Sequence, residues 1–162
     1  MTPEARLAEL GIELPAPNPA VANYVGAVSV GEIVFVSGHG PYRDGEYLYR
    51  GKLGREIDVP TGQLAARLTI LNLLASLKAE IGELDRVKRV VKLLVLVNSD
   101  PEFKEQHLVA NGASDLLVEA FGRERGLHAR SAIGMGALPF GISVEIEGIF
   151  EVGPRSTSLL SE

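Results

Sequence analysis

Residues 130–150 constrain the fold most strongly, because they read as two β-strands joined by a turn. Residues 143–147 (SVEIE) alternate polar and apolar side chains, which is the period of a half-buried strand. The earlier part of the stretch runs into the small residues 134–137, and glycine in a strand usually marks a bulge or a close approach to the backbone. Residues 138–141 (LPFG) supply the turn, because proline fixes φ and glycine can adopt a positive φ.

This arrangement places a guanidinium, Arg130, at the start of one strand and a carboxylate, Glu145, on the next. An arginine can hold a substrate carboxylate through two parallel N–H groups, and a glutamate can orient or activate water. Each residue also has a simpler interpretation. A single arginine at a strand start is usually a surface charge or part of a salt bridge, and Glu145 alternates with apolar neighbours as an outward-facing strand residue does. From the residues alone, both interpretations stay open.

The first half of the chain predicts a helix, a hairpin and a second helix. Residues 3–10 favour a short helix, and residues 24–28 and 33–37 favour a β-hairpin. Residues 38–54 are rich in glycine and tyrosine and predict a loop with at most one short strand. A long helix then begins at Asp58 and ends at Gly82.

The second half predicts a strand followed by another helix. Residues 87–97 form a strand whose second half is apolar on both faces. Residues 99–102 resemble a capping box and predict a helix start, with a break near Asn111. Gly122 and Gly126 are the predicted helix ends.

These elements predict an α+β fold, with a mixed or antiparallel sheet and two main helices on one face. Two helices cannot cover both faces of such a sheet, yet residues 33–36 and 93–97 offer apolar side chains to both faces. The uncovered face must meet another surface, and a second copy of the same sheet is the simplest partner. The argument predicts an oligomer and leaves the number of chains open.

Composition and charge exclude several classes of function. The 162 residues, 46% of them hydrophobic, fit one domain with its own core. A net charge of −5 lacks the electrostatic footprint of a nucleic-acid-binding protein. There is no cysteine, and the three histidines lack metal-ligand spacing, so we expect neither a metal nor another cofactor. No signal peptide and no apolar run of about 20 residues appears, so a cytoplasmic protein without a membrane partner is the default interpretation.

Three sets of residues carry a resemblance to a known family. Residues 129–131 (ARS), the Leu-Pro pair eight residues after Arg130, and residues 144–147 (VEIE) form the most specific set. Tyr24 with the Ser37-Gly38 pair and Pro41 is the second set, and Asn111 is the third. Together, over roughly residues 24–152, the chain resembles the Rid (YjgF-type) reactive-intermediate deaminases.

The resemblance implies a chorismate-mutase-like fold, a homotrimer around a central barrel of sheets, and ligand sites in clefts between subunits. It implies that Arg130 holds the carboxylate of a 2-imino acid, that Glu145 positions the hydrolytic water, and that the Ala132 backbone meets the imine nitrogen. Tyr24, Ser37 and Gly38 would line the pocket. Asn111 would lie near the cleft, although its residue type also suits a helix cap.

The chain departs from the compact family pattern and resembles a longer branch, with an extension before Tyr24 and a longer loop at residues 42–58. We expect residues 1–23 to pack on a core formed by residues 24–152, and residues 153–162 to be a flexible tail. The implied activity is hydrolysis of enamine and 2-imino acid intermediates to 2-oxo acids and ammonia. The alternative is a non-catalytic trimer that binds a small carboxylate as a metabolite sensor, and a ribonuclease is disfavoured by the acidic balance.

Overall fold

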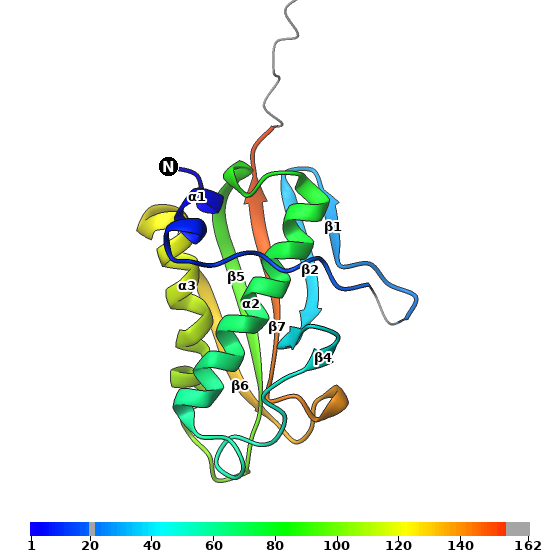
Figure 1. Cartoon of the computed structure of the whole chain (residues 1–162), viewed down its shortest axis with the longest axis vertical. Helices are drawn as coiled ribbons and strands as arrows, with labels where there is room; N and C mark the ends of the chain where they lie inside the picture. The colour runs from blue at the N-terminus through cyan, green and yellow to red at the C-terminus, as the bar shows by residue number, and fades with distance from the viewer. Residues whose placement is uncertain (20–21, 155–162) are drawn as a thin grey trace, which may run out of the picture.

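A computed structural model describes residues 1–19 and 22–154. Its helices and strands follow one another along the chain in the order seen in Figure 1: α1 (Pro3–Glu9), β1 (Ala27–Val30), β2 (Ile33–His39), β3 (Tyr42–Arg43), β4 (Glu46–Tyr47), α2 (Val59–Ile81), η1 (Leu84–Arg86), β5 (Val87–Asn98), α3 (Gln106–Gly126), β6 (Ala129–Met135), η2 (Pro139–Gly141) and β7 (Val144–Val152). Beyond Pro154, the predicted tail lies outside the described residues.

The main sheet has five strands in the order β1-β2-β7-β5-β6, and only the pair β5–β6 is parallel. The predicted strands at both ends of the stretch 130–150 are present, but they do not form a hairpin. β5 lies between β6 and β7 and pairs with both of them. The long apolar run of β5 explains this position, because a strand that is apolar on both faces is suited to the middle of a sheet. The α+β prediction with a mixed sheet is confirmed.

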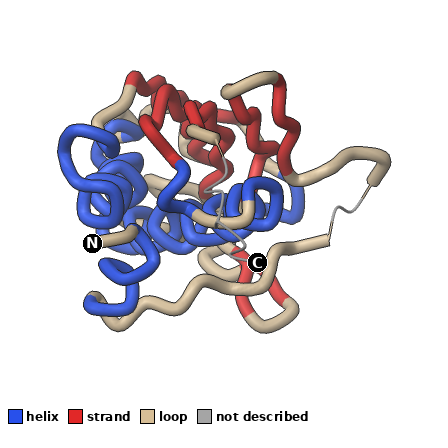
Figure 2. The backbone as a smooth tube through the Cα atoms, turned by 90° about the horizontal axis from the view of Figure 1, so that it is seen from above, coloured by secondary structure: helices blue, strands red, loops and turns tan. Residues whose placement is uncertain are grey.

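The helices form a second layer against one face of the sheet, as Figure 2 shows from above. α2 begins as predicted, since the Asp58 carboxylate accepts a hydrogen bond from the backbone N–H of Thr61 at 2.9 Å. Gly112 lets α3 approach α2 closely, because a Cβ atom there would lie 2.1 Å from the carbonyl oxygen of Gln63. The Gln63 side chain also donates to the Leu108 carbonyl at 2.9 Å. α3 is therefore fixed against α2 at the level of the residues that face β6.

The predicted start of the last helix is wrong. Ser99 pairs with Leu53 in an isolated bridge, Pro101 and Glu102 form a turn, and α3 begins only at Gln106. Asp100 is engaged elsewhere: its carboxylate accepts from Arg55 Nε at 2.7 Å and from the backbone N–H of Glu102 at 3.0 Å. The predicted break near Asn111 is also wrong, because α3 is continuous there and becomes non-helical at Gly122 (φ 76°, ψ 164°).

The hairpin of β1 and β2 is confirmed, while residues 38–54 hold two short paired strands, β3 and β4, where at most one was predicted. The N-terminal segment contacts the core: Leu7 of α1 is buried in it, and the Glu4 carboxylate accepts from the backbone N–H of Leu84 at 2.7 Å. None of the helices among the described residues is long and apolar enough to span a bilayer.

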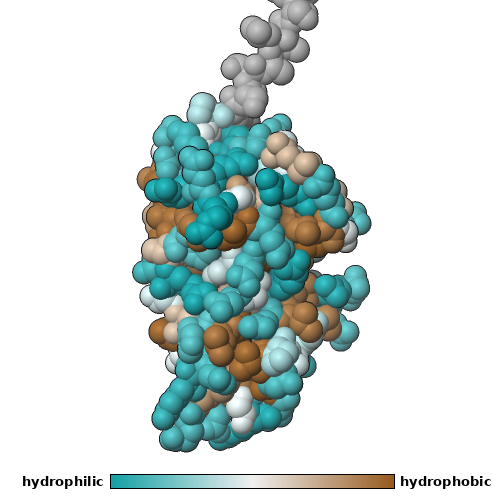
Figure 3. Space-filling model, turned by 90° about the vertical axis from the view of Figure 1, so that its left-hand side faces the viewer, coloured by the Kyte–Doolittle hydropathy of each residue, from teal (hydrophilic) through white to brown (hydrophobic). Residues whose placement is uncertain are grey.

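The face of the sheet opposite the helices carries both apolar and charged side chains. Four apolar side chains are exposed on it: Val28, Val30, Phe35 and Ile133. The strand pairing places them on the same face as the acidic residues of β7, which alternate along that strand with buried residues. The α3 side of the molecule, seen in Figure 3, also shows apolar patches among hydrophilic residues. The open sheet face therefore supplies the uncovered apolar surface that the sequence predicts.

Candidate functional site

Arg130 lies on β6, the strand at one edge of the sheet, and its side chain faces α3. Its register partner Leu93 is fully buried on the helix side, and paired residues of neighbouring strands point to the same face. The Nη1 group donates to Asn111 Oδ1 at 2.9 Å and to Ser114 Oγ at 3.0 Å, and Nη2 donates to the His107 carbonyl at 3.2 Å. We call Arg130 and these acceptors the arginine cluster.

The acceptors come together because His107, Asn111 and Ser114 are spaced four and three residues apart along α3. That spacing places all three on one face of a helix. Asn111 therefore lies inside the helix and does not cap it, so the capping interpretation is wrong.

The arginine cluster leaves part of the guanidinium available to a ligand. A guanidinium has five N–H donors, and three are assigned above, so one on Nε and one on Nη2 remain among the described residues. Within those residues no carboxylate lies at salt-bridge distance from Arg130. Arg130 also lines an open depression of about 480 Å³ beside α3. A charged group held only by neutral acceptors in such a place is suited to bind an anion.

Glu145 lies on β7 and faces the open side of the sheet, opposite Leu96 of β5. Its carboxylate packs against the backbone of β2, because a Cβ atom on Gly38 would lie 2.1 Å from Glu145 Oε1. Only glycine therefore fits at position 38 without moving the carboxylate. Burial raises the pKa of the Glu145 carboxyl above its ordinary value, and the nearby Glu147 raises it further. Such a carboxylate takes up a proton more readily than an ordinary glutamate does.

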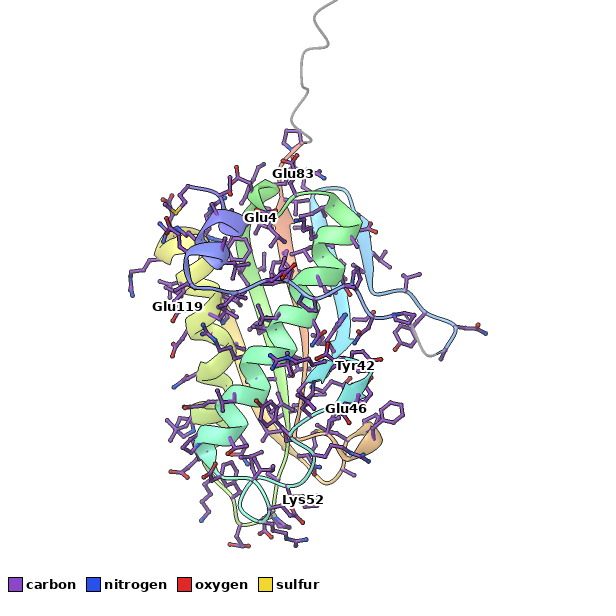
Figure 4. All side chains as sticks on the ribbon, viewed as in Figure 1. Glu4, Tyr42, Glu46, Lys52, Glu83 and Glu119 are labelled. Atoms are coloured by element: carbon purple, nitrogen blue, oxygen red, sulfur yellow. The ribbon has the colours of Figure 1, made fainter. Side chains whose placement is uncertain are left out.

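Tyr47 lies near Glu145, and we call Glu145 with Tyr24, Gly38 and Tyr47 the glutamate cluster. Tyr24, Gly38 and Tyr47 line a small pocket of about 40 Å³. Burial raises the pKa of the Tyr47 hydroxyl, and Tyr24, Tyr42 and Glu145 raise it further. Tyr47 belongs to the β3–β4 hairpin, where Figure 4 labels Tyr42 and Glu46. The longer loop of this chain thus contributes a wall to the pocket.

Tyr47 is held by two further rings. It stacks on Phe140 with ring centroids 4.9 Å apart and meets the edge of Tyr42 at 5.1 Å. Phe140 adopts a positive φ of 60°, a strained conformation for an aromatic residue, and its carbonyl accepts from Arg50 Nε at 2.8 Å. The turn between β6 and β7 is therefore fixed against the pocket wall.

Ser37 and His39 have structural roles beside the glutamate cluster. The Ser37 hydroxyl donates to the Val25 carbonyl at 2.6 Å, so it connects β2 to the segment that carries Tyr24. His39 is buried, with Nδ1 2.6 Å from the Ser37 carbonyl and Nε2 2.7 Å from Ser76 Oγ. Burial lowers the pKa of its imidazole, which favours a neutral ring.

One protomer does not bring Arg130 and Glu145 together. β5 separates their strands, the two side chains point to opposite faces of the sheet, and the strand spacing places their Cα atoms roughly 14 Å apart. Ala132 shares the face and the edge strand of Arg130, where half of the backbone polar groups point away from β5. The predicted site residues therefore form two groups, with Asn111, Arg130 and Ala132 in one and Tyr24, Ser37, Gly38 and Glu145 in the other.

Sequence reasoning missed Ser114, His128 and Tyr47. Ser114 could have been found from its spacing to Asn111, because residues three apart share a helix face. His128 and Tyr47 carried no such signal, since their positions depend on contacts between distant segments. No group of three or more potential metal ligands occurs in residues 1–19 and 22–154.

Comparison with known proteins gives consistent matches along the chain. Residues 4–145 match the model of a family described as "YjgF/chorismate mutase-like, putative endoribonuclease". Protein TCP17 of Trypanosoma cruzi is 49% identical over 148 residues, which cover 91% of this chain and 92% of that protein. The crystal structure of the protein Atu1372 from Agrobacterium tumefaciens has a TM-score of 0.85 and 45% identity, covering 93% of this chain and 92% of that one. The E. coli protein TdcF, crystallised with bound serine, has a TM-score of 0.61 and 25% identity, covering 85% of this chain and 94% of that one.

Proposed function

This chain belongs to the YjgF/chorismate mutase-like family, and from that premise we propose that it hydrolyses reactive enamine and 2-imino acid intermediates to 2-oxo acids and ammonia. The observation that carries the proposal is the half-buried guanidinium of Arg130, held by neutral acceptors with two N–H donors remaining. Such a group suits the carboxylate that every 2-imino acid carries. The serine bound to TdcF is also an amino acid with a carboxylate.

The reaction needs the substrate held in place and one water activated. Arg130 fixes the carboxylate, and the backbone of Ala132 on the same edge strand meets the imine nitrogen. A water oxygen bonds to the imine carbon while Glu145 accepts one of the water protons, and the C=N π electron pair moves to nitrogen, which takes up that proton from Glu145 and becomes an amine. The remaining hydroxyl proton then passes to the amine nitrogen as the C–N bond breaks with its electron pair on nitrogen, giving a carbonyl group and ammonia.

The proposal requires two copies of the chain, because Arg130 and Glu145 lie on opposite faces of one sheet. We propose a cytoplasmic homotrimer in which the arginine cluster of one subunit meets the glutamate cluster of the next. The exposed apolar side chains on the open sheet face support such an assembly, since contiguous exposed apolar surface favours association.

A non-catalytic role remains the second candidate, because the arginine cluster is complete in one protomer without Glu145. The protein would then bind a small carboxylate as a metabolite sensor. Release of ammonia from a 2-imino acid generated in the assay separates the two functions. RNA cleavage is disfavoured by the net charge of −5.

Subunit complementation tests the proposed shared site. Arg130→Ala and Glu145→Gln chains should each be inactive as homotrimers, and light scattering should give the mass of three chains for both. Refolding equal amounts of the two variant chains together should restore about a quarter of wild-type ammonia release. In a closed ring, each trimer that contains both chains has one site in which Arg130 and Glu145 are both present. Mixed trimers without recovered activity would show that the two clusters do not act across an interface, and a one-chain mass would exclude the assembly.

A further inference from the structure

A line of hydrogen bonds runs from Arg130 away from the proposed ligand. Ser114 Oγ lies 3.0 Å from Arg130 Nη1 and 3.0 Å from His128 Nε2, and His128 Nδ1 lies 2.7 Å from the Gly126 carbonyl oxygen. Ser114 and His128 are both half-buried, and both line the depression that Arg130 also lines. None of the reaction steps above uses either side chain.

The direction of each bond follows from the chemistry of the groups. A carbonyl oxygen only accepts, so the proton of the neutral ring is on Nδ1 of His128, and Nε2 carries a lone pair. The Ser114 hydroxyl therefore donates to Nε2 and keeps its own lone pairs for the Arg130 N–H. A neutral ring fits its surroundings, because burial, and to a smaller degree the Arg130 charge, lower the pKa of His128.

We propose that Ser114 and His128 are positioning residues that fix the orientation of the Arg130 guanidinium. Ser114 and Asn111 together occupy both N–H groups of Nη1, which leaves the Nε and Nη2 donors for a carboxylate. His128 orients the Ser114 hydroxyl so that its lone pair, and not its proton, faces Arg130. The inference rests on the proposed function only in taking the ligand of Arg130 to be a carboxylate.

The same depression contains groups that could capture a released guanidinium. Asp115 and Glu119 of α3 also line it, and Glu119, labelled in Figure 4, is at present 3.3 Å from Arg67 Nη1. A guanidinium with one fewer acceptor could turn toward these carboxylates, and its anion-binding donors would then be neutralised. Ser114 thus keeps Arg130 apart from the carboxylates of its own chain.

Calorimetry with 2-oxobutyrate tests the proposal. Ser114→Ala should weaken binding roughly 2- to 12-fold, the loss expected for one net hydrogen bond, while Ser114→Thr should bind within about 2-fold of wild type because it keeps the hydroxyl. In turnover, Ser114→Ala should raise KM and leave kcat nearly unchanged, since the reacting carbon and water are untouched. Ser29→Ala, which also removes a bonded hydroxyl but on β1, is the matched control and should change neither constant.

Nitrogen NMR of the His128 ring gives a readout that folding alone would not change. The wild-type ring should be the Nδ1–H tautomer, and 2-oxobutyrate should shift its signals in wild type but not in Arg130→Ala. An Nε2–H tautomer in wild type, or equal binding by Ser114→Ala and wild type, would overturn the proposal. If Arg130→Ala itself binds 2-oxobutyrate normally, the carboxylate site of the proposed function fails. If Arg130→Ala loses binding and Ser114→Ala does not, only the present inference fails.

Discussion

Arg130 has three neutral acceptors around its guanidinium, whereas no donor among the described residues reaches the carboxylate of Glu145. Both groups are half-buried, so both are removed in part from water. The protein therefore supplies acceptors for the Arg130 guanidinium within the protomer, whereas the Glu145 carboxyl has no donor in the described part of the chain and its pKa is raised.

The difference shows which part of the site is ready before ligand or partner arrives. The arginine cluster is preorganised by α3, itself fixed against α2 by the close approach at Gly112. The glutamate cluster lies on the open sheet face, where water or a second copy must supply its missing donors. In the proposed assembly, the arginine cluster of one subunit would bind substrate first and the glutamate cluster of the next would then activate water.

The largest expected effect is on the chemical step. Glu145→Gln should lower kcat by about 100-fold or more, because a positioned acid–base group typically contributes at least that much. Binding of 2-oxobutyrate should stay near the wild-type value, since the arginine cluster is intact. Glu147→Gln, on the same face of β7, is the matched control and should retain most of its kcat. Unchanged imine hydrolysis in Glu145→Gln would make Glu145 an ordinary outward strand residue.

The next effect is on affinity. Arg130→Lys should weaken carboxylate binding by about 10- to 150-fold, close to the loss in Arg130→Ala, because an ammonium cannot reproduce two parallel N–H groups. Calorimetry with 2-oxobutyrate measures this loss, and Arg89→Lys, exposed on β5, controls for the general effect of the change. Normal binding by the Arg130→Lys chain would mean that charge alone suffices and that the planar geometry has no role.

The sequence indicates candidate residues for both clusters, but it does not indicate how the strands that carry them are arranged. Local motifs propose the candidate site residues of both clusters, and Asp58 and Gly82 predict the boundaries of α2, which the structure confirms. The sequence does not predict the strand order: the apolar run of β5 favours a central position, but its place between β6 and β7 is set by contacts between distant segments. Asparagine favours helix ends, so its residue type predicts a cap at Asn111, but Asn111 lies inside α3 and its side chain accepts a hydrogen bond from Arg130.

The pH dependence of kcat should distinguish the role of the Glu145 carboxylate from that of the Arg130 guanidinium. Activity should fall about tenfold per pH unit as pH drops through the raised pKa of Glu145, because only the carboxylate accepts the water proton. Carboxylate binding to the arginine cluster should change little over the same range, because the binding group is a guanidinium and not a carboxyl. Glu147→Gln should move the acid limb of kcat to lower pH by removing a like charge. An acid limb that stays in place in Glu147→Gln would mean that another group limits the rate.

The smallest effects are on stability, and they should have opposite signs. Asn111→Ala should destabilise the fold by about 0.5–1.5 kcal/mol, because it leaves an Arg130 N–H without its acceptor. Glu145→Gln should instead stabilise the protein at neutral pH. The folded-state pKa of Glu145 lies above the ordinary value of 4.5, so its ionised form is disfavoured in the folded state, and that cost disappears as pH falls below 4.5. Urea unfolding at pH 7 and pH 4 should thus show the advantage of Glu145→Gln at the higher pH only. A destabilised Glu145→Gln at pH 7 would mean that the carboxylate has donors in the assembled protein, and the contrast between the two clusters would then exist only in the isolated protomer.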